Sequence, residues 1–285
     1  MTTARPLIGA HVSAAGRLPD AIDRAKRIGA ECIQLFGASP REWAARPPKK
    51  EDAVDFQERR RKESIGPVYL HAAYLVNLAS PNSALRAHSE RSLADHLRIA
   101  GALGAEGLIF HIGSGKELPK EEAIRYVVGA MRRVLEEALG ETLLIIENSA
   151  GGGHKIGSSL KEIAHIMRQI GSRRVKMCFD TAHAFEAGVI KRYDREGVAQ
   201  LLAALDGTVG LDALVALHVN DSKTAFNSHH DRHENIGEGQ IGLDGFRELA
   251  KHTELHDKAW ILEVPGFEGK GPDSRNIELL KSCFS

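Results

Sequence analysis

The chain has 285 residues, of which 42% are hydrophobic and 27% charged, a composition typical of a soluble globular protein with a large core. Basic and acidic side chains each number 38, so the net charge does not indicate a nucleic-acid partner, and any basic surface must be local. No run approaches the ~18 apolar residues of a membrane helix, and the N-terminus lacks the apolar stretch of a signal peptide, so we expect neither.

Eight short apolar runs recur along the chain, and each has the length of a strand buried on both faces. Near-continuous hydrophobicity of this kind is typical of a parallel sheet. The spacing between successive runs leaves room for a helix after each strand. The runs cover residues 7–13, 32–37, 68–73, 107–113, 143–149, 175–180, 214–221 and 259–266.

Helices are predicted where apolar residues recur at i, i+3, i+4 and i+7 between these runs. Residues 18–28 and 124–138 follow this pattern. A third helix, over 159–170, begins with a capping box formed by its first serine and Glu162, and Gly171 follows as its C-cap. Eight strand–helix units in one chain predict a (β/α)8 TIM-type barrel, a single domain over residues 1–285. An open doubly wound sheet is the alternative.

Six successive predicted strands, the third to the eighth, each carry one potential metal ligand near the C-terminal end. Barrel enzymes place their active sites at that end. A carboxylate within an apolar strand would be a buried charge that needs a strong partner, and a metal is the natural one. The six residues are His71, His111, Glu147, Asp180, His218 and Glu263.

Three further residues extend this set. His183 lies three residues after Asp180, at a turn that leads into a helix. Asp231 and His233 lie in the long segment after the seventh strand, and their i, i+2 spacing places both on one side of an extended chain.

The nine side chains are five imidazoles and four carboxylates, with no thiolate, which suits zinc or manganese. Two tetrahedral metals offer about eight positions, so nine ligands would leave none for water. Three metals fit better, especially if one carboxylate bridges. The excess positive charge of about two then favours a bound hydroxide and a phosphate. This count predicts a multi-metal phosphoesterase.

Four long segments resemble the endonuclease IV family of AP endonucleases. They are IGAHVSAAG near the start, IENSAGGG around Glu147, FDTAHAFEAG around Asp180 and LHVNDSKTAFNSHHDRHENIGEG around His218. The resemblance runs from Ile8 to about Gly266, nearly the whole chain.

The resemblance implies a zinc-dependent phosphodiesterase that acts on double-stranded DNA. The expected reaction hydrolyses the phosphodiester 5′ to an abasic site and leaves a 3′-hydroxyl and a 5′-deoxyribose phosphate. Removal of 3′-blocking groups, as a 3′-phosphatase or 3′-diesterase, is the expected companion activity. Three zinc ions are implied, with Mn2+ an option in one site. The first would be held by His71, His111 and Glu147, the second by Glu147, Asp180, His218 and Glu263, and the third by His183, Asp231 and His233.

We expect Glu147 and Glu263 to act in catalysis, with Glu263 orienting or deprotonating the attacking water. An abasic nucleotide must leave the stack, and in the family two loops fill or wedge the gap. Arg41, Tyr74 and Leu75 occupy the matching positions. The sequence departs from the commoner family pattern nearby, with Ser39 where asparagine is frequent and with alanines after His71.

Several expectations and alternatives accompany this hypothesis. A xylose-isomerase-like sugar isomerase or epimerase shares the predicted architecture, but it has no evident need for a third ligand set. A barrel that binds damaged DNA without turnover is the non-catalytic alternative. His11, near the barrel mouth, is interpreted as a hydrogen-bonded structural residue.

Cys32, Cys178 and Cys283 form no CxxC pair, so we expect reduced thiols and a cytoplasmic protein. A monomer is the default expectation for an enzyme that must wrap a kinked duplex.

Overall fold

Eight parallel strands close into a barrel in the computed structural model, which describes residues 5–39, 42–43 and 45–285. The strands follow the order β1-β10-β7-β6-β5-β4-β3-β2, and β1 pairs with both β10 and β2, so the sheet has no edge. The closed sheet confirms the predicted TIM-type barrel and excludes the open doubly wound sheet. The barrel strands are β1 (Ile8–His11), β2 (Ile33–Phe36), β3 (Val68–His71), β4 (Gly107–Phe110), β5 (Leu143–Glu147), β6 (Val175–Asp180), β7 (Leu214–His218) and β10 (Ala259–Leu262).

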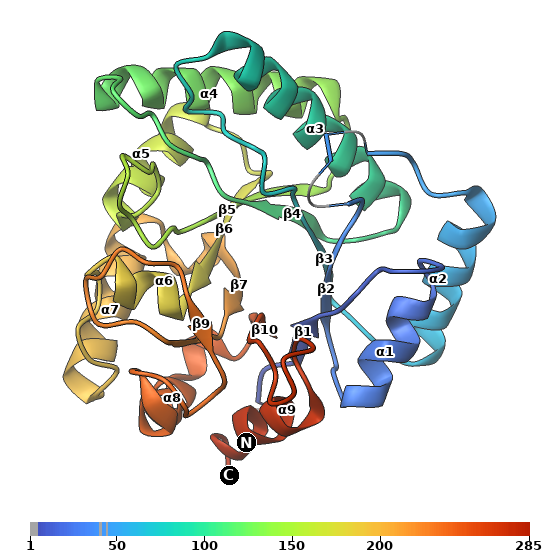
Figure 1. The fold of residues 1–285 in the computed structure, drawn as a ribbon, viewed down its shortest axis with the longest axis vertical. Helices are drawn as coiled ribbons and strands as arrows, with labels where there is room; N and C mark the ends of the chain where they lie inside the picture. The colour runs from blue at the N-terminus through green and yellow to red at the C-terminus, as the bar shows by residue number, and fades with distance from the viewer. Residues whose placement is uncertain (1–4, 40–41, 44) are drawn as a thin grey trace.

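Helices surround the strands as an outer ring (Figure 1). They bury one apolar stripe against the barrel, as α1 does with Ala21, Ile22 and Ala25. The helices of the described chain are α1 (Asp20–Ile28), α2 (Lys50–Lys62), α3 (Ser83–Ala102), α4 (Lys120–Glu137), α5 (Leu160–Ile170), α6 (Thr181–Glu186), α7 (Arg195–Thr208), α8 (Gly242–Ala250) and α9 (Ser274–Ser282). Within this described part, no helix is long and apolar enough to cross a membrane.

The ends of α5 match the sequence prediction at one terminus and differ from it at the other. Gly171 adopts the left-handed conformation, with φ of 70°, as expected of a C-cap. The predicted capping box is wrong in detail, because Ser159 makes no side-chain cap hydrogen bond. The Glu162 carboxylate instead accepts a 2.6 Å hydrogen bond from the Gly157 N–H and pairs with Lys120, so it is not available to the serine.

The barrel interior explains why polar side chains converge at its mouth. One internal layer is formed by Cys32, Tyr69, Ile109, Ile145, Cys178, Ala216, Ala259 and Ile261. Side chains of a strand alternate between its two faces, so the residue two positions further on points to the same interior. Two residues beyond Cys32, Tyr69, Ile109, Ile145, Cys178, Ala216 and Ile261 come Gln34, His71, His111, Glu147, Asp180, His218 and Glu263.

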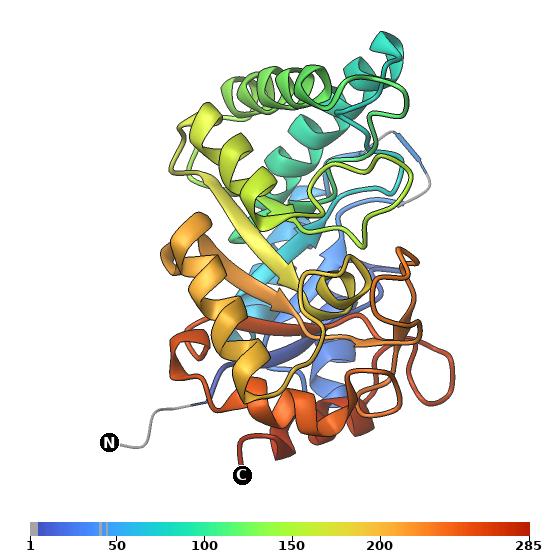
Figure 2. The same ribbon diagram turned by 90° about the vertical axis from the view of Figure 1, so that its left-hand side faces the viewer.

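Two departures from the regular strand–helix alternation add structure at this end of the barrel. The short helix α6 follows β6 directly, and Asp180 caps it by accepting a 2.7 Å hydrogen bond from the His183 N–H. After β7 the chain forms an antiparallel pair of short strands, β8 (Asp221–Ser222) and β9 (His233–Glu234). The view turned by 90° shows the long loops gathered at the end toward which the strand arrows point (Figure 2).

Candidate metal centre

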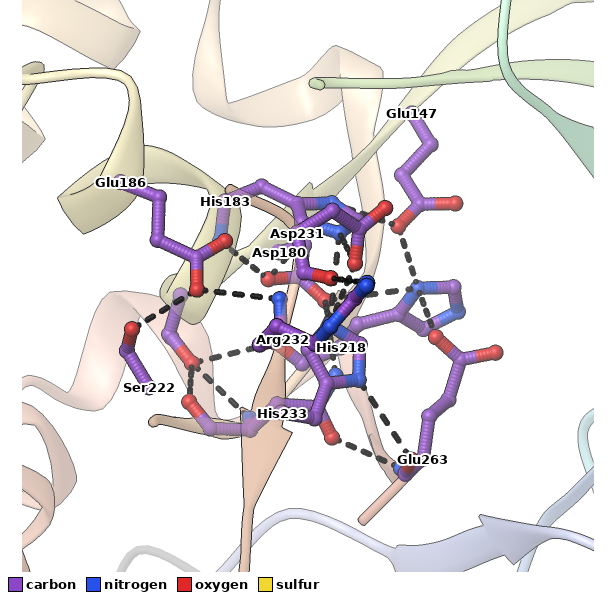
Figure 3. Close-up of polar contacts among 12 residues, drawn as sticks. Glu147, Asp180, His183, Glu186, His218, Ser222, Asp231, Arg232, His233 and Glu263 are labelled. Carbon is purple, nitrogen blue, oxygen red and sulfur yellow. Dashed lines mark hydrogen bonds and ion pairs between the residues drawn. The ribbon is translucent and has the colours of Figure 1, made fainter. Parts of the chain in front are cut away.

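The structure brings all nine predicted ligand residues together at the C-terminal mouth of the barrel. Side chains from β3, β5, β6 and β7 and from just beyond β4 and β10 converge there, joined by His183 of α6 and by two residues from the segment after β8. Figure 3 labels those from Glu147 onward. Each residue offers one ligand atom, a ring nitrogen or a carboxylate oxygen, and within a set these atoms all lie within 4.8 Å of one another. One set is His71, His111 and Glu147, and another is Glu147, Asp180, His218 and Glu263.

Glu147 stands between these two sets, with one carboxylate oxygen toward each. Its Oε2 lies 3.0 Å from His71 Nε2 and 3.4 Å from His111 Nε2. Its Oε1 lies 2.9 Å from His218 Nδ1, which is itself 3.2 Å from Glu263 Oε2. The side chain is fully buried and has the geometry of a bridging carboxylate.

His183, Asp231 and His233 form a compact third set. His183 Nε2 lies 3.2 Å from Asp231 Oδ1 and 3.3 Å from His233 Nε2, and Asp231 Oδ1 lies 3.9 Å from His233 Nε2. Two ligands of a tetrahedral zinc, each roughly 2.0–2.1 Å from the metal, are about 3.3 Å apart. The two separations from His183 match this value, and the one between Asp231 and His233 exceeds it. His183 also groups with His111 and Asp231, and with Asp180 and His233.

The second ring nitrogen of four histidines lies against an oxygen. A metal-binding histidine donates its other N–H in this way, which sets the tautomer and the ring orientation. The contacts are His71 Nδ1 to Ala72 O at 2.9 Å, His183 Nδ1 to Asn148 O at 3.0 Å, His218 Nε2 to Gln34 Oε1 at 2.7 Å and His233 Nδ1 to Glu263 O at 3.4 Å. His111 Nδ1 is buried without a hydrogen-bond partner in the described chain. The residues thus fit divalent metal ions both in their donor atoms and in their orientation.

Strong electrostatic coupling links the histidines and carboxylates of the centre. Burial would raise the pKa of Glu147, but His111, His183 and His218 hold it well below the usual value. Burial would lower the pKa of His183, but the neighbouring carboxylates, Asp180 foremost, raise it well above the usual value. By contrast, burial lowers the pKa of His111 to about 4. Asp180 and its neighbours therefore favour the charged form of His183, whereas burial favours the neutral form of His111.

A cavity of about 300 Å³ opens onto the centre. Its lining includes Phe36 and Tyr74 besides six of the nine predicted ligands. Tyr74 is 70% exposed, and its ring lies 5.4 Å from that of Phe36, in an edge-to-face arrangement. Leu75 is half-buried and does not line the cavity, while Arg41 lies outside the described residues.

Gln34 is a residue of this centre that the sequence interpretation missed. It is fully buried, and its Nε2 donates a 2.5 Å hydrogen bond to Glu263 Oε1 while its Oε1 faces His218. His11 Nδ1 lies 2.8 Å from the same amide and 3.3 Å from Glu263 Oε1. His11 is thus a hydrogen-bonded neighbour, as expected. The sequence did contain a signal for Gln34, because it is a polar residue in an otherwise apolar strand, two positions after the interior residue Cys32.

Comparison with known proteins places this geometry in a class. Residues 22–283 match the family model described as "Xylose isomerase-like TIM barrel", so the chain belongs to that class of barrels. A D-tagatose 3-epimerase-like protein shares the fold with a TM-score of 0.69 and covers 96% of each chain, but it is only 17% identical, so this likeness shows the fold alone.

Within that class, the chain belongs to the endonuclease IV family. It is 35% identical over 275 residues to "Probable endonuclease 4" of Halothermothrix orenii, covering 96% of this chain and 99% of the relative. It is 36% identical to the protein of the same name from Aquifex aeolicus, covering 98% of each. The crystal structure of endonuclease IV from Thermus thermophilus matches with a TM-score of 0.86 and 32% identity, over 98% of both chains.

Proposed function

We propose that this chain is a DNA-repair endonuclease that hydrolyses the phosphodiester 5′ to an abasic site in duplex DNA. The products would be a 3′-hydroxyl and a 5′-deoxyribose phosphate, and the same centre would remove 3′-blocking groups. Membership in the endonuclease IV family supports this proposal. The observation that carries it is the third ligand set, His183, Asp231 and His233, beside a Glu147 that faces two further sets.

The nine residues would hold three zinc ions, with Mn2+ an alternative in one position. His71, His111 and Glu147 would bind the first, Glu147, Asp180, His218 and Glu263 the second, and His183, Asp231 and His233 the third. When bound, such metals polarise phosphoryl oxygens and lower the pKa of water toward neutrality. The absence of thiolates from the set favours these ions over softer metals.

Glu263 is the residue we assign to the attacking water. Its carboxylate borders the cavity, with 17% of the side chain exposed, and Gln34 and His11 hold Oε1. Burial would raise its pKa, but His218 and the hydrogen bond from His11 hold the pKa well below the usual value. Glu263 therefore remains ionised at neutral pH, and its carboxylate can accept a hydrogen bond that orients the attacking water molecule.

Asp231 and Tyr74 lie where DNA would meet the centre. The Asp231 side chain is 44% exposed, unlike the buried His183 beside it. An abasic sugar reaches a recessed centre only after it leaves the duplex, and an aromatic side chain at the rim can stack in the gap. We assign this role to Tyr74, with Arg41 and Leu75 as further DNA contacts, and the loops at this end of the barrel as the DNA-binding surface.

An incision assay tests the proposal. The metal-loaded protein should cut a duplex that carries one tetrahydrofuran abasic analogue and should leave a 3′-hydroxyl that a polymerase can extend. A His111→Ala, Glu147→Ala double variant should lose this cleavage and bind fewer zinc ions per chain. Full cleavage by the double variant, or a modified sugar at the 3′ end, would overturn the proposal. Metal binding without incision would favour the non-catalytic alternative.

A further inference from the structure

A buried carboxylate, Glu186, connects helix α6 with the loop that carries Asp231. Glu186 has no exposed surface, and its Oε1 lies 3.2 Å from the Arg232 N–H nitrogen. The hydroxyl oxygens of Ser222 and Thr224 lie 2.8 Å and 3.1 Å from the same atom (Figure 3 draws the Ser222 contact). The contacts join the end of α6 to both sides of the segment that runs from β8 to β9.

The backbone of α6 is joined to the same loop. The last carbonyls of a helix have no partner within the helix and must find donors elsewhere. The Phe185 carbonyl accepts a hydrogen bond from Asn227 N at 3.1 Å, and the Glu186 carbonyl accepts one from His229 N at 3.0 Å. Asn227 and His229 both have φ of 59°, a left-handed conformation that non-glycine residues adopt rarely and that asparagine and histidine tolerate better than most. The loop thus takes its shape against the end of α6.

The contact between Glu186 and Arg232 matters because of where Arg232 lies in the chain. Arg232 stands between the two residues that the loop contributes to the third set, Asp231 and His233. The third member, His183, lies three residues before Glu186 on α6, one helical turn away. One short helix therefore carries both a member of the set and the acceptor that holds the loop bearing the other two.

A carboxylate in this place needs an explanation beyond packing. Burying a charge costs free energy, and burial raises the pKa of Glu186. Its second oxygen, Oε2, is buried with no hydrogen-bond partner in the described chain. An apolar residue would fill the same space without this cost, but it could not accept a hydrogen bond. What glutamate adds at this position is therefore the acceptor Oε1.

We propose that Glu186 is a positioning residue for the third metal: through the Arg232 N–H it fixes Asp231 and His233 at the spacing that binding with His183 requires. The inference rests on the proposed function. It predicts a selective effect, because the side-chain hydrogen bonds of Glu186 go to Ser222, Thr224 and Arg232 and not to a member of the His71 set or the Glu263 set. Loss of an outer partner of metal ligands lowers metal affinity by about 10–100-fold.

Zinc release from the loaded protein tests the inference. Wild-type protein and Glu186→Ala are titrated with a chromophoric zinc chelator, and zinc per chain is counted at each step. We expect three zinc ions in both at low chelator, with one ion leaving Glu186→Ala at about 10–100-fold lower chelator and the other two unchanged. Glu186→Gln keeps an oxygen acceptor and should retain the wild-type profile. If Glu186→Ala does not fold, Glu186→Asp, which withdraws the carboxylate, should show the same selective release.

Glu162→Ala is the matched control, because Glu162 is also buried and also accepts a backbone N–H, that of Gly157, away from the third set. It should lower stability without a selective loss of zinc. Unchanged release from Glu186→Ala, equal loss of all three ions, or a Glu186→Gln profile like that of the alanine variant would each overturn the inference. A wild-type protein that binds fewer than three zinc ions would instead overturn the proposed centre, and the inference with it.

Discussion

Gln34→Leu removes the polar contacts that join two members of the second ligand set while keeping a side chain of similar size. The substitution leaves the His218 Nε2–H without its 2.7 Å acceptor and Glu263 Oε1 without its 2.5 Å donor. A buried polar group that loses its partner costs about 1–3 kcal/mol. His218 loses its partner outright, whereas Glu263 Oε1 keeps the 3.3 Å contact with His11, so we expect a cost of at least about 1–3 kcal/mol. Zinc affinity at the second set should fall by about 10–100-fold because the ligands lose their outer support.

Three measurements on the Gln34→Leu variant check this reasoning. Urea unfolding of the chelator-treated protein gives the free energy of unfolding, zinc titration gives the affinity, and incision of abasic DNA gives kcat/KM. Ser89→Ala is the control, because the buried hydroxyl of Ser89, on α3, also makes two hydrogen bonds, accepting from Asn77 N and donating to Leu85 O. It should lose stability while zinc affinity stays at the wild-type value. Wild-type zinc affinity in Gln34→Leu would refute the argument.

Three further outcomes follow from the geometry. Glu147→Gln should lower zinc affinity in both sets that its two oxygens face, and reduce incision by at least about 100-fold; loss of a single zinc would contradict the bridging role. In the metal-free protein the pKa values of His183 and His218 are raised, so the folded state holds protons that the unfolded state releases above about pH 6.5. Stability should therefore fall as the pH rises from about 6.5, as chemical denaturation at several pH values will show; a flat profile would argue against the coupling. Tyr74→Ala should weaken binding to abasic duplex by about 1–3 kcal/mol in a fluorescence titration, while loss of the ring contact with Phe36 lowers the free energy of unfolding by about 0.5–1.5 kcal/mol; equal affinity would remove Tyr74 from the DNA surface.

The sequence predicted the barrel because its signals are local. A strand buried on both faces needs a short apolar run, and eight such runs at helix-sized intervals define eight strand–helix units. The alternation of strand side chains is also local, so a polar residue that ends an interior-facing row, such as Glu147 or His218, already indicates a group at the barrel mouth. The same rule, applied to β2, would have found Gln34.

Hydrogen bonds for which several neighbouring groups compete were not predictable from local patterns. Ser159 and Glu162 have the spacing of a capping box, but the Gly157 N–H and Lys120 engage the glutamate instead. A spacing rule describes which contacts are possible, and the tertiary surroundings determine which of them forms.

The sequence by itself determined which side chains stand at the strand ends, since strand period and chain order are properties of neighbouring residues. Only the tertiary structure decided how those side chains share a centre. Closing the barrel turned the two oxygens of Glu147 toward different sets, and docking of the loop on α6 brought Arg232 to Glu186, 46 residues away along the chain. Such contacts arise from packing between distant segments, and no local pattern of residues encodes their distances.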